Sequence, residues 1–213
     1  MRRVVLFLVA LVAIGCQSSL LVSVSDISLY VAENFSLTAD GTGVNYSSRN
    51  PFVATVDNTG KIVALHEGET EIDVVAREGE TSVKVTVKSH YNDIVIPLLE
   101  WGISPNQLKN RVGKPYETTD EACLYVYGDA KNDDVHIGTS YYFENERLSA
   151  VMLVFNPKYT NRALLNLAER WQYYGEIANQ YVLGDTLEIE DAETLILMTK
   201  QSGTWVAIFT ENN

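Results

Sequence analysis

The chain has 213 residues, a formal net charge of -12 at pH 7 and two cysteines. This acidic balance argues against nucleic acid as a partner, because a surface that binds phosphates must be basic. It also argues against electrostatic attachment to anionic lipid headgroups. The length is sufficient for one large or two small domains.

The chain opens with MRRVVLFLVALVAIGCQSS, in which two arginines precede an apolar run from Val4 to Gly15. As a helix this run would span roughly 18 Å, which is too short to cross a hydrocarbon core about 30 Å thick. Basic residues before a short apolar run that ends in small residues are typical of an export signal. We therefore predict a signal peptide over residues 1–15, with ordinary secretion after cleavage nearby as the alternative.

The end of this signal, Ala13-Ile14-Gly15-Cys16, resembles the lipobox of bacterial lipoproteins. The resemblance implies that Cys16 carries a diacylglyceryl thioether and that its acyl chains anchor the protein to a membrane. Residues 16–19 are then the lipidated start and a short linker. Gln17 is not the aspartate that retains enteric lipoproteins at the inner membrane. The resemblance thus implies the outer membrane, at its periplasmic face or at the cell surface.

Residues 20–88 alternate apolar and polar positions between turn residues that recur every eight to twelve positions, a pattern typical of short strands. In the stretch from residue 61 to 88, Ile72 and Val74 alternate with polar neighbours, as do Val83 and Val85. The links HEGE and REGE supply glycine for tight turns. This pattern predicts a small β-sandwich.

The stretch NYSSRNPFVATVDNTGKIVALHEGETEI resembles the bacterial Ig-like domain, group 2. It shares the run VATVD at residues 53–57, followed by Gly60, Ala64 and Gly68, while Tyr46 occupies the usual tryptophan position. The resemblance implies a rigid spacer without catalytic residues. Such modules also bind carbohydrate or host proteins in some cases. A single copy beside an anchor predicts a stalk.

Residues 90–213 contain helical as well as strand patterns. Ser104, Gln107 and Gly113 indicate a short capped helix, and NRALLNLAERWQYYG predicts a longer helix over residues 161–175. Six strands are predicted in ACLYVYG, GTSYYFE, RLSAVMLVF, DTLEIE, TLILMTK and TWVAIFT. The fold class is therefore multi-domain, with an all-β Ig-like sandwich followed by an α+β domain, an antiparallel sheet with two helices on one side.

The start of this second domain, GISPNQLKNRVGKP, is similar to the start of the small lipoprotein of the outer-membrane β-barrel assembly machinery. The shared residues are Gly102, Leu108, Gly113 and Pro115. This similarity implies an assembly scaffold as an alternative function. The combination of anchor, Ig-like module and aromatic-rich domain also resembles lipoproteins of Bacteroidota.

The residues that could support catalysis are few. Cys123 lies within a predicted strand, where a free cysteine is typically a core residue. The acidic loop GDAKNDDVHIG does not have calcium-loop spacing, because Lys131 falls on the second ligand position. We expect no metal, no cofactor and no enzymatic activity. The alternative is a polysaccharide hydrolase that uses Glu144 and Glu146 as acid and base, since we expect these two residues to alternate at the end of a strand with their carboxylates on the same side.

Exposed aromatic residues are the better candidates for ligand binding. The pairs Tyr141-Tyr142 and Tyr173-Tyr174 each have one ring that could point to solvent, since adjacent strand residues face opposite sides. We take Tyr142 and Tyr173 as candidate ligand-binding residues, with core packing as the alternative. The sequence predicts a cell-envelope lipoprotein whose Ig-like stalk presents an α+β domain to a protein or glycan partner.

Overall fold

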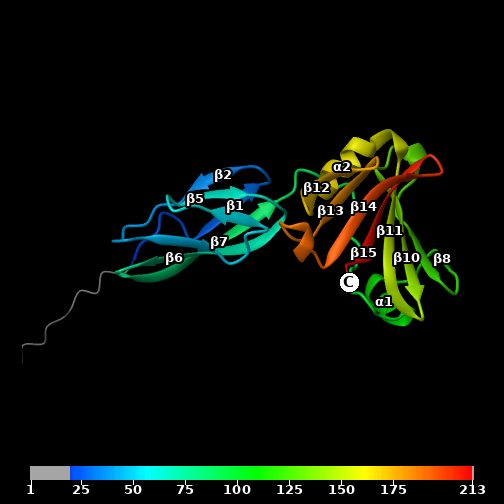
Figure 1. Cartoon of the computed structure of the whole chain (residues 1–213), viewed down its shortest axis with the longest axis horizontal. Coiled ribbons are helices and arrows are strands. Elements are labelled where there is room, and N and C mark those ends of the chain that lie inside the picture. Colours follow the sequence, from blue (N-terminus) through cyan, green and yellow to red (C-terminus); the bar gives the residue numbers. More distant parts are fainter. Residues whose placement is uncertain (1–19, 213) are drawn as a thin grey trace, which may run out of the picture.

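The computed structural model describes residues 20–212, which form two domains placed one after the other along the long axis of the molecule (Figure 1). The predicted signal peptide and the predicted lipid attachment at Cys16 lie outside the described residues. Among the described residues, no helix has the length and apolar character needed to cross a membrane.

The first domain is a sandwich of two sheets. One sheet has the strand order β1-β7-β6-β3 and the other β2-β5-β4. The first strand pairs in parallel with the last, and the other neighbouring strands are antiparallel. The strands are β1 (Asp26–Tyr30), β2 (Asn34–Ser36), β3 (Asn45–Ser48), β4 (Ala54–Val56), β5 (Lys61–Ala64), β6 (Gly68–Ala76) and β7 (Gly79–Lys88).

The core of this domain follows the alternation in the sequence. Ile72 and Val74 of β6 are fully buried, as are Val83 and Val85 of β7. Each strand therefore has one face in the core, and the predicted β-sandwich is confirmed. Tyr46, at the usual tryptophan position, packs against the same core.

The second domain is built on one eight-stranded sheet with the order β12-β13-β14-β15-β11-β10-β9-β8. All neighbouring strands are antiparallel. The elements are α1 (Pro105–Val112), β8 (Glu117–Thr118), β9 (Ala122–Val126), η1 (Ala130–Asn132), β10 (His136–Glu144), β11 (Arg147–Phe155), η2 (Pro157–Tyr159), α2 (Thr160–Ala168), β12 (Gln172–Ile177), β13 (Gln180–Gly184), η3 (Ile189–Asp191), β14 (Thr194–Gln201) and β15 (Thr204–Glu211).

One face of this sheet carries the core of the domain. Leu108 of α1 and Leu167 of α2 are fully buried against it. In the segment that follows the first domain, Ile94 is buried and Trp101 packs half-buried against the same core. The antiparallel sheet with helices on one side agrees with the predicted architecture in outline. The domain is nevertheless mostly β, since its two α-helices are short.

The sequence located α1 correctly because the signals for its ends are local. The Ser104 hydroxyl accepts a hydrogen bond from the Gln107 N–H, and the Gln107 side chain accepts one from the Ser104 N–H. This reciprocal pair satisfies two backbone donors that would otherwise lack partners. Gly113 follows the helix with φ at 100°, where glycine is favoured.

Two predicted elements are wrong. The helix predicted over residues 161–175 ends at Ala168, and Gln172–Ile177 is instead strand β12, which pairs with β13. The stretch DTLEIE is not a strand: the Asp185 carboxylate accepts hydrogen bonds from the N–H groups of Glu193 and Thr194, which holds residues 185–193 as a loop. Tertiary pairing and side-chain bonds override the local periodicity here.

Candidate functional site

The two predicted ligand-binding tyrosines lie on opposite faces of the eight-stranded sheet. Tyr173 is 41% exposed and pairs with Leu183, whose side chain is in the core beneath the helices. Tyr142 is 37% exposed and lies between Ala122 and Ala150 on the other face. The two rings therefore cannot belong to one ligand surface.

Tyr173 has aromatic neighbours on adjacent strands. Its ring centroid lies 6.3 Å from that of Tyr181, which in turn stacks on Trp205 at 5.6 Å with the planes 18° apart. Tyr181 and Trp205 are half-buried against the core, while Tyr173 is the outermost ring. We call these three residues the aromatic row. The sequence did not suggest Tyr181 or Trp205, because the strand pairing that brings them to Tyr173 is non-local.

The face that carries Tyr142 has no covering element among the described residues. We call it the open face. Its central row crosses six strands in register: Val182, Leu197, Ile208, Met152, Ser140 and Leu124. Leu197 is the most exposed of the large side chains in this row, at 38%.

Two flanking rows complete the open face. The first holds Leu195, Thr210, Ala150, Tyr142 and Ala122, and the second holds Thr199, Val206, Val154, Gly138 and Val126. None of the side chains in the three rows is charged. Individual exposed apolar residues are ordinary, but an uncharged and mainly apolar face of this extent, with hydroxyls at Ser140, Thr199, Thr210 and Tyr142, is a candidate interaction site.

His136 is a buried structural residue. Its Nδ1 accepts a hydrogen bond from the Val95 N–H at 3.0 Å, which leaves the proton on Nε2 to be donated to the Gly138 carbonyl at 3.0 Å. Burial lowers the pKa of His136 to about 4, because desolvation disfavours the charged ring. The imidazole is therefore neutral and fully used in holding the Val95 segment against β10.

The acidic loop beside His136 is held by its own contacts. Asp133 pairs with Lys158 at 2.6 Å, and this contact holds the pKa of the Asp133 carboxyl below its usual value. The Asp129 and Asp134 carboxylates accept hydrogen bonds from backbone N–H groups within the loop. In the described part of the chain, no group of three His, Cys, Asp or Glu side chains is arranged to hold a metal ion.

The residues considered for catalysis are not brought together. Glu144 ends β10 opposite Arg147, whereas Glu146 lies in the turn that follows, where Asn145 and Glu146 both have positive φ. The expected alternation of the two glutamates at a strand end is therefore wrong. Cys123 is 1% exposed and lies in the core.

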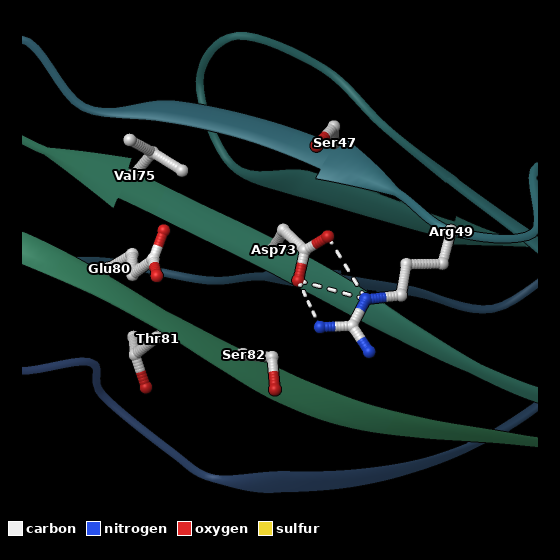
Figure 2. Close-up of a pocket in the computed structure, with 7 residues that line it drawn as sticks. All are labelled: Ser47, Arg49, Asp73, Val75, Glu80, Thr81 and Ser82. Carbon is white, nitrogen blue, oxygen red and sulfur yellow. Dashed lines mark hydrogen bonds and ion pairs between the residues drawn. The ribbon is translucent and has the colours of Figure 1, made fainter.

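The first domain presents a polar hollow of about 420 Å³ on the outer face of its larger sheet. Figure 2 shows Arg49 reaching to Asp73 across this hollow. The Arg49 guanidinium donates to Asp73 at 2.7 Å and lies 2.6 Å from Glu71. Because these pairs are exposed, they contribute little to stability. The lining holds Arg49 together with the carboxylates of Asp73 and Glu80, so the hollow keeps a net negative charge, as on a solvated sheet face.

The two domains meet at a polar joint formed by Glu169, immediately after α2. Its carboxylate accepts hydrogen bonds from the Ser89 hydroxyl at 2.5 Å and the His90 N–H at 2.7 Å, and lies 2.8 Å from His90 Nδ1. Burial alone would raise the pKa of the Glu169 carboxyl, but these hydrogen bonds outweigh it and lower that pKa. The Glu169 carbonyl also accepts from the Glu67 N–H in the first domain.

Arg170 is the second member of the joint. Its Nε lies 2.7 Å from a Glu67 carboxylate oxygen, and its terminal nitrogens donate to the carbonyls of Tyr91 and Asn166. The Arg170 side chain is only 8% exposed. One buried guanidinium thus connects the first domain, the linker and α2. A planar group with five donors suits such a position better than a lysine would.

Residues 28–87 match the family model of the bacterial Ig-like domain (group 2). This match confirms the resemblance inferred for the first domain and does not extend to residues 90–213. No curated protein matches the chain.

Solved structures give distant similarities to the chain. A mutant of intimin from EHEC O157:H7 is 14% identical, with 56% of this chain and 76% of that chain covered and a TM-score of 0.27. Domains 5-6 of the S-layer protein SbsC are 15% identical, with 91% and 83% covered and a TM-score of 0.28. Human protocadherin-24 EC1-2 is 11% identical, with 90% and 94% covered and a TM-score of 0.27. Sequence identities and TM-scores this low do not indicate a shared function.

Proposed function

We propose that the protein is a cell-envelope lipoprotein in which the Ig-like domain is a stalk and the C-terminal domain binds a protein or glycan partner. The anchor is the lipid on Cys16, at the outer membrane. The opening run MRRVVLFLVALVAIGC and the family match at residues 28–87 support this assignment. The role is one of recognition and not of catalysis.

The observation that carries this proposal is the joint between the domains. A stalk can present a binding domain in a fixed direction only if the connection is stiff, because domains on a free linker reorient independently. Here Glu169 and Arg170 bond to residues 89–91 and to Glu67 on the far side of the linker. The C-terminal domain is thereby held to the end of the stalk.

The lipid anchor can be checked from the mass of the native protein. We expect the protein purified from its membrane fraction to lack residues 1–15 and to carry added diacylglyceryl and acyl mass at Cys16, because the lipobox directs both steps. Intact-mass spectrometry measures this directly. A product that still contains Met1, or that has no lipid mass, would contradict the proposed location.

The aromatic row is the ligand surface that we propose. Tyrosine and tryptophan combine a large apolar ring with a polar tip, and such residues contribute most to recognition surfaces. Tyr173 is exposed at the outer end of the row and lies next to Tyr181, which in turn stacks on Trp205. In this arrangement a ligand would contact the exposed ring of Tyr173, whose position is restricted by the neighbouring Tyr181 ring.

We expect Tyr173→Ala to weaken ligand binding by about 30-fold, a typical loss for a central aromatic contact. The measurement is retention of purified envelope polysaccharides and envelope proteins on the immobilised chain. Tyr116→Ala is the matched control, since Tyr116 is 77% exposed in the same domain but outside the aromatic row. Equal loss with both variants, or loss with neither while ligand is retained, would contradict this assignment.

A further inference from the structure

The open face takes no part in the joint or in the aromatic row, so its role is independent of the proposed function. We propose that the open faces of two copies of the chain pack against each other and that the protein is a symmetric dimer. Sheets that pack face to face lie about 10 Å apart and bury their facing side chains.

The sequences of the central strands indicate burial on both sides. Residues 195–198 of β14 read LILM, residues 150–155 of β11 read AVMLVF and residues 205–209 of β15 read WVAIF. A strand with one wet face alternates apolar and polar residues, whereas a strand covered on both faces is continuously apolar. In the described structure, α1 and α2 cover only one face of these strands. A second layer of protein packed on the open face would give these strands the burial on both sides that their sequences indicate.

The open face is large enough for a small interface. Five strand spacings from β13 to β9 give a width of about 24 Å, and four residues along each strand give about 13 Å. With the reach of the side chains, this amounts to at most roughly 600 Å² on each copy, because Val182, Val206 and Ser140 are already buried within one chain. Two such faces bury at most roughly 1,200 Å², which is the size of a small, weak interface.

The arrangement of side chains makes this face complementary to itself. Strands β14 and β10 lie at equal distances on either side of the central pair β15 and β11. A twofold axis that lies in the interface, parallel to the strands and between this pair, therefore places β14 of one copy over β10 of the other. Leu197, 38% exposed, then lies over Ser140, which is small and 8% exposed. The most exposed large side chain of the central row thus meets a small residue of the same row.

The same axis matches the rest of the face. Ile208 of one copy lies over Met152 of the other, and Leu195 lies over Tyr142, because each pair occupies the same row. No charge is buried, although the chain has a net charge of -12. Two copies would repel each other through most of their surfaces, but the open face avoids the cost of desolvating unpaired charges. A face without charged side chains suits a second copy better than a polar ligand.

The first test is the oligomeric state of the chain from residue 16 onward, with Cys16→Ser to prevent lipidation. Sedimentation from about 1 to about 300 µM should show a monomer–dimer equilibrium with a micromolar dissociation constant. Leu197→Glu should weaken the dimer at least about tenfold, since two carboxylates would be buried. Leu165→Glu should have no effect, because Leu165 is 47% exposed on α2, on the covered side of the sheet.

The second test fixes the geometry and does not depend on a charged variant folding. An equimolar mixture of the Leu197→Cys and Ser140→Cys chains should be joined by a short bis-maleimide, whereas a mixture of Leu165→Cys and Ser140→Cys should not. Cys123 is buried and does not compete for the reagent.

Three results would overturn the proposal. The first is a chain that remains monomeric at every concentration. The second is a dimer that Leu197→Glu does not weaken, or that gives no Leu197–Ser140 cross-link. The third is a monomer that floats with phosphatidylcholine vesicles unless Leu197 is replaced, which would assign the open face to lipid. None of these results would affect binding at Tyr173.

Discussion

Single side chains in this protein have roles that depend on their surroundings more than on their chemistry. In the sequence His136 is one polar residue of an acidic loop. In the fold it is buried and joins Val95 to Gly138 through a hydrogen bond at each ring nitrogen. Both ring nitrogens have hydrogen-bond partners, so the neutral ring is satisfied where it lies. A proton on Nδ1 would displace the Val95 N–H from its acceptor.

This burial predicts a pH-dependent loss of stability. The pKa of His136 falls from 6.5 in the unfolded chain to about 4 in the folded one. As the pH decreases from 6.5 towards 4, the unfolded chain gains a proton that the folded chain excludes, so the free energy of unfolding decreases. Between pH 7 and pH 4.5 we expect His136 to account for a loss of about 2 to 3 kcal/mol.

Urea unfolding at the two pH values measures this loss. Trp101, Trp171 and Trp205 all lie in the C-terminal domain, so their fluorescence reports on that domain alone. Comparison with His136→Gln isolates the contribution of this residue from those of the carboxylates. A variant with the same decrease as the parent chain would show that His136 is not responsible.

At the scale of elements, the sequence was informative where structure depends on near neighbours. The ends of α1 are encoded by Ser104, Gln107 and Gly113, which are within ten residues of one another. The end of α2 is not encoded in this way, because the aromatic residues from Trp171 to Tyr174 suit either a helix face or a strand. Pairing with β13 makes this stretch a strand, and Gly175, with φ at 136°, accommodates the irregularity in register.

The open face is also a feature of elements and not of residues. The apolar runs of β11, β14 and β15 are visible in the sequence, but their two-sided character has meaning only once the helices are known to cover one side. Tyr142 lies on this face and apart from the aromatic row, so it is no longer a candidate for the ligand surface that contains Tyr173. It becomes a candidate contact between copies of the chain.

At the scale of the whole molecule, the joint determines how the two domains are related. We expect Arg170→Met to loosen it, because the variant loses the bonds to Tyr91 and Asn166 and the ion pair with Glu67. Because the Glu67 side chain is 37% exposed and stays solvated, we expect a loss of about 2 kcal/mol, mainly from the two hydrogen bonds of the buried guanidinium. The free energy of unfolding should decrease accordingly, and the domains should reorient more freely.

Small-angle X-ray scattering of the Leu197→Glu chain, with and without Arg170→Met, measures this freedom without self-association. The distribution of interatomic distances should broaden in the Arg170 variant. Lys158→Met is the matched control, since it removes an exposed ion pair with Asp133 away from the joint. Identical scattering from all three chains would mean that the joint does not set the domain orientation.

The sequence by itself determined the division into two domains, the Ig-like sandwich, the first capped helix and the antiparallel sheet, because each rests on local turn chemistry or on a period that short stretches repeat. It did not determine the boundary between α2 and β12, the separation of Tyr142 from Tyr173, the aromatic row or the joint. Those depend on contacts between residues far apart in the chain. Glu169 meets Ser89 and His90 only after both domains have folded, and no local pattern encodes that meeting.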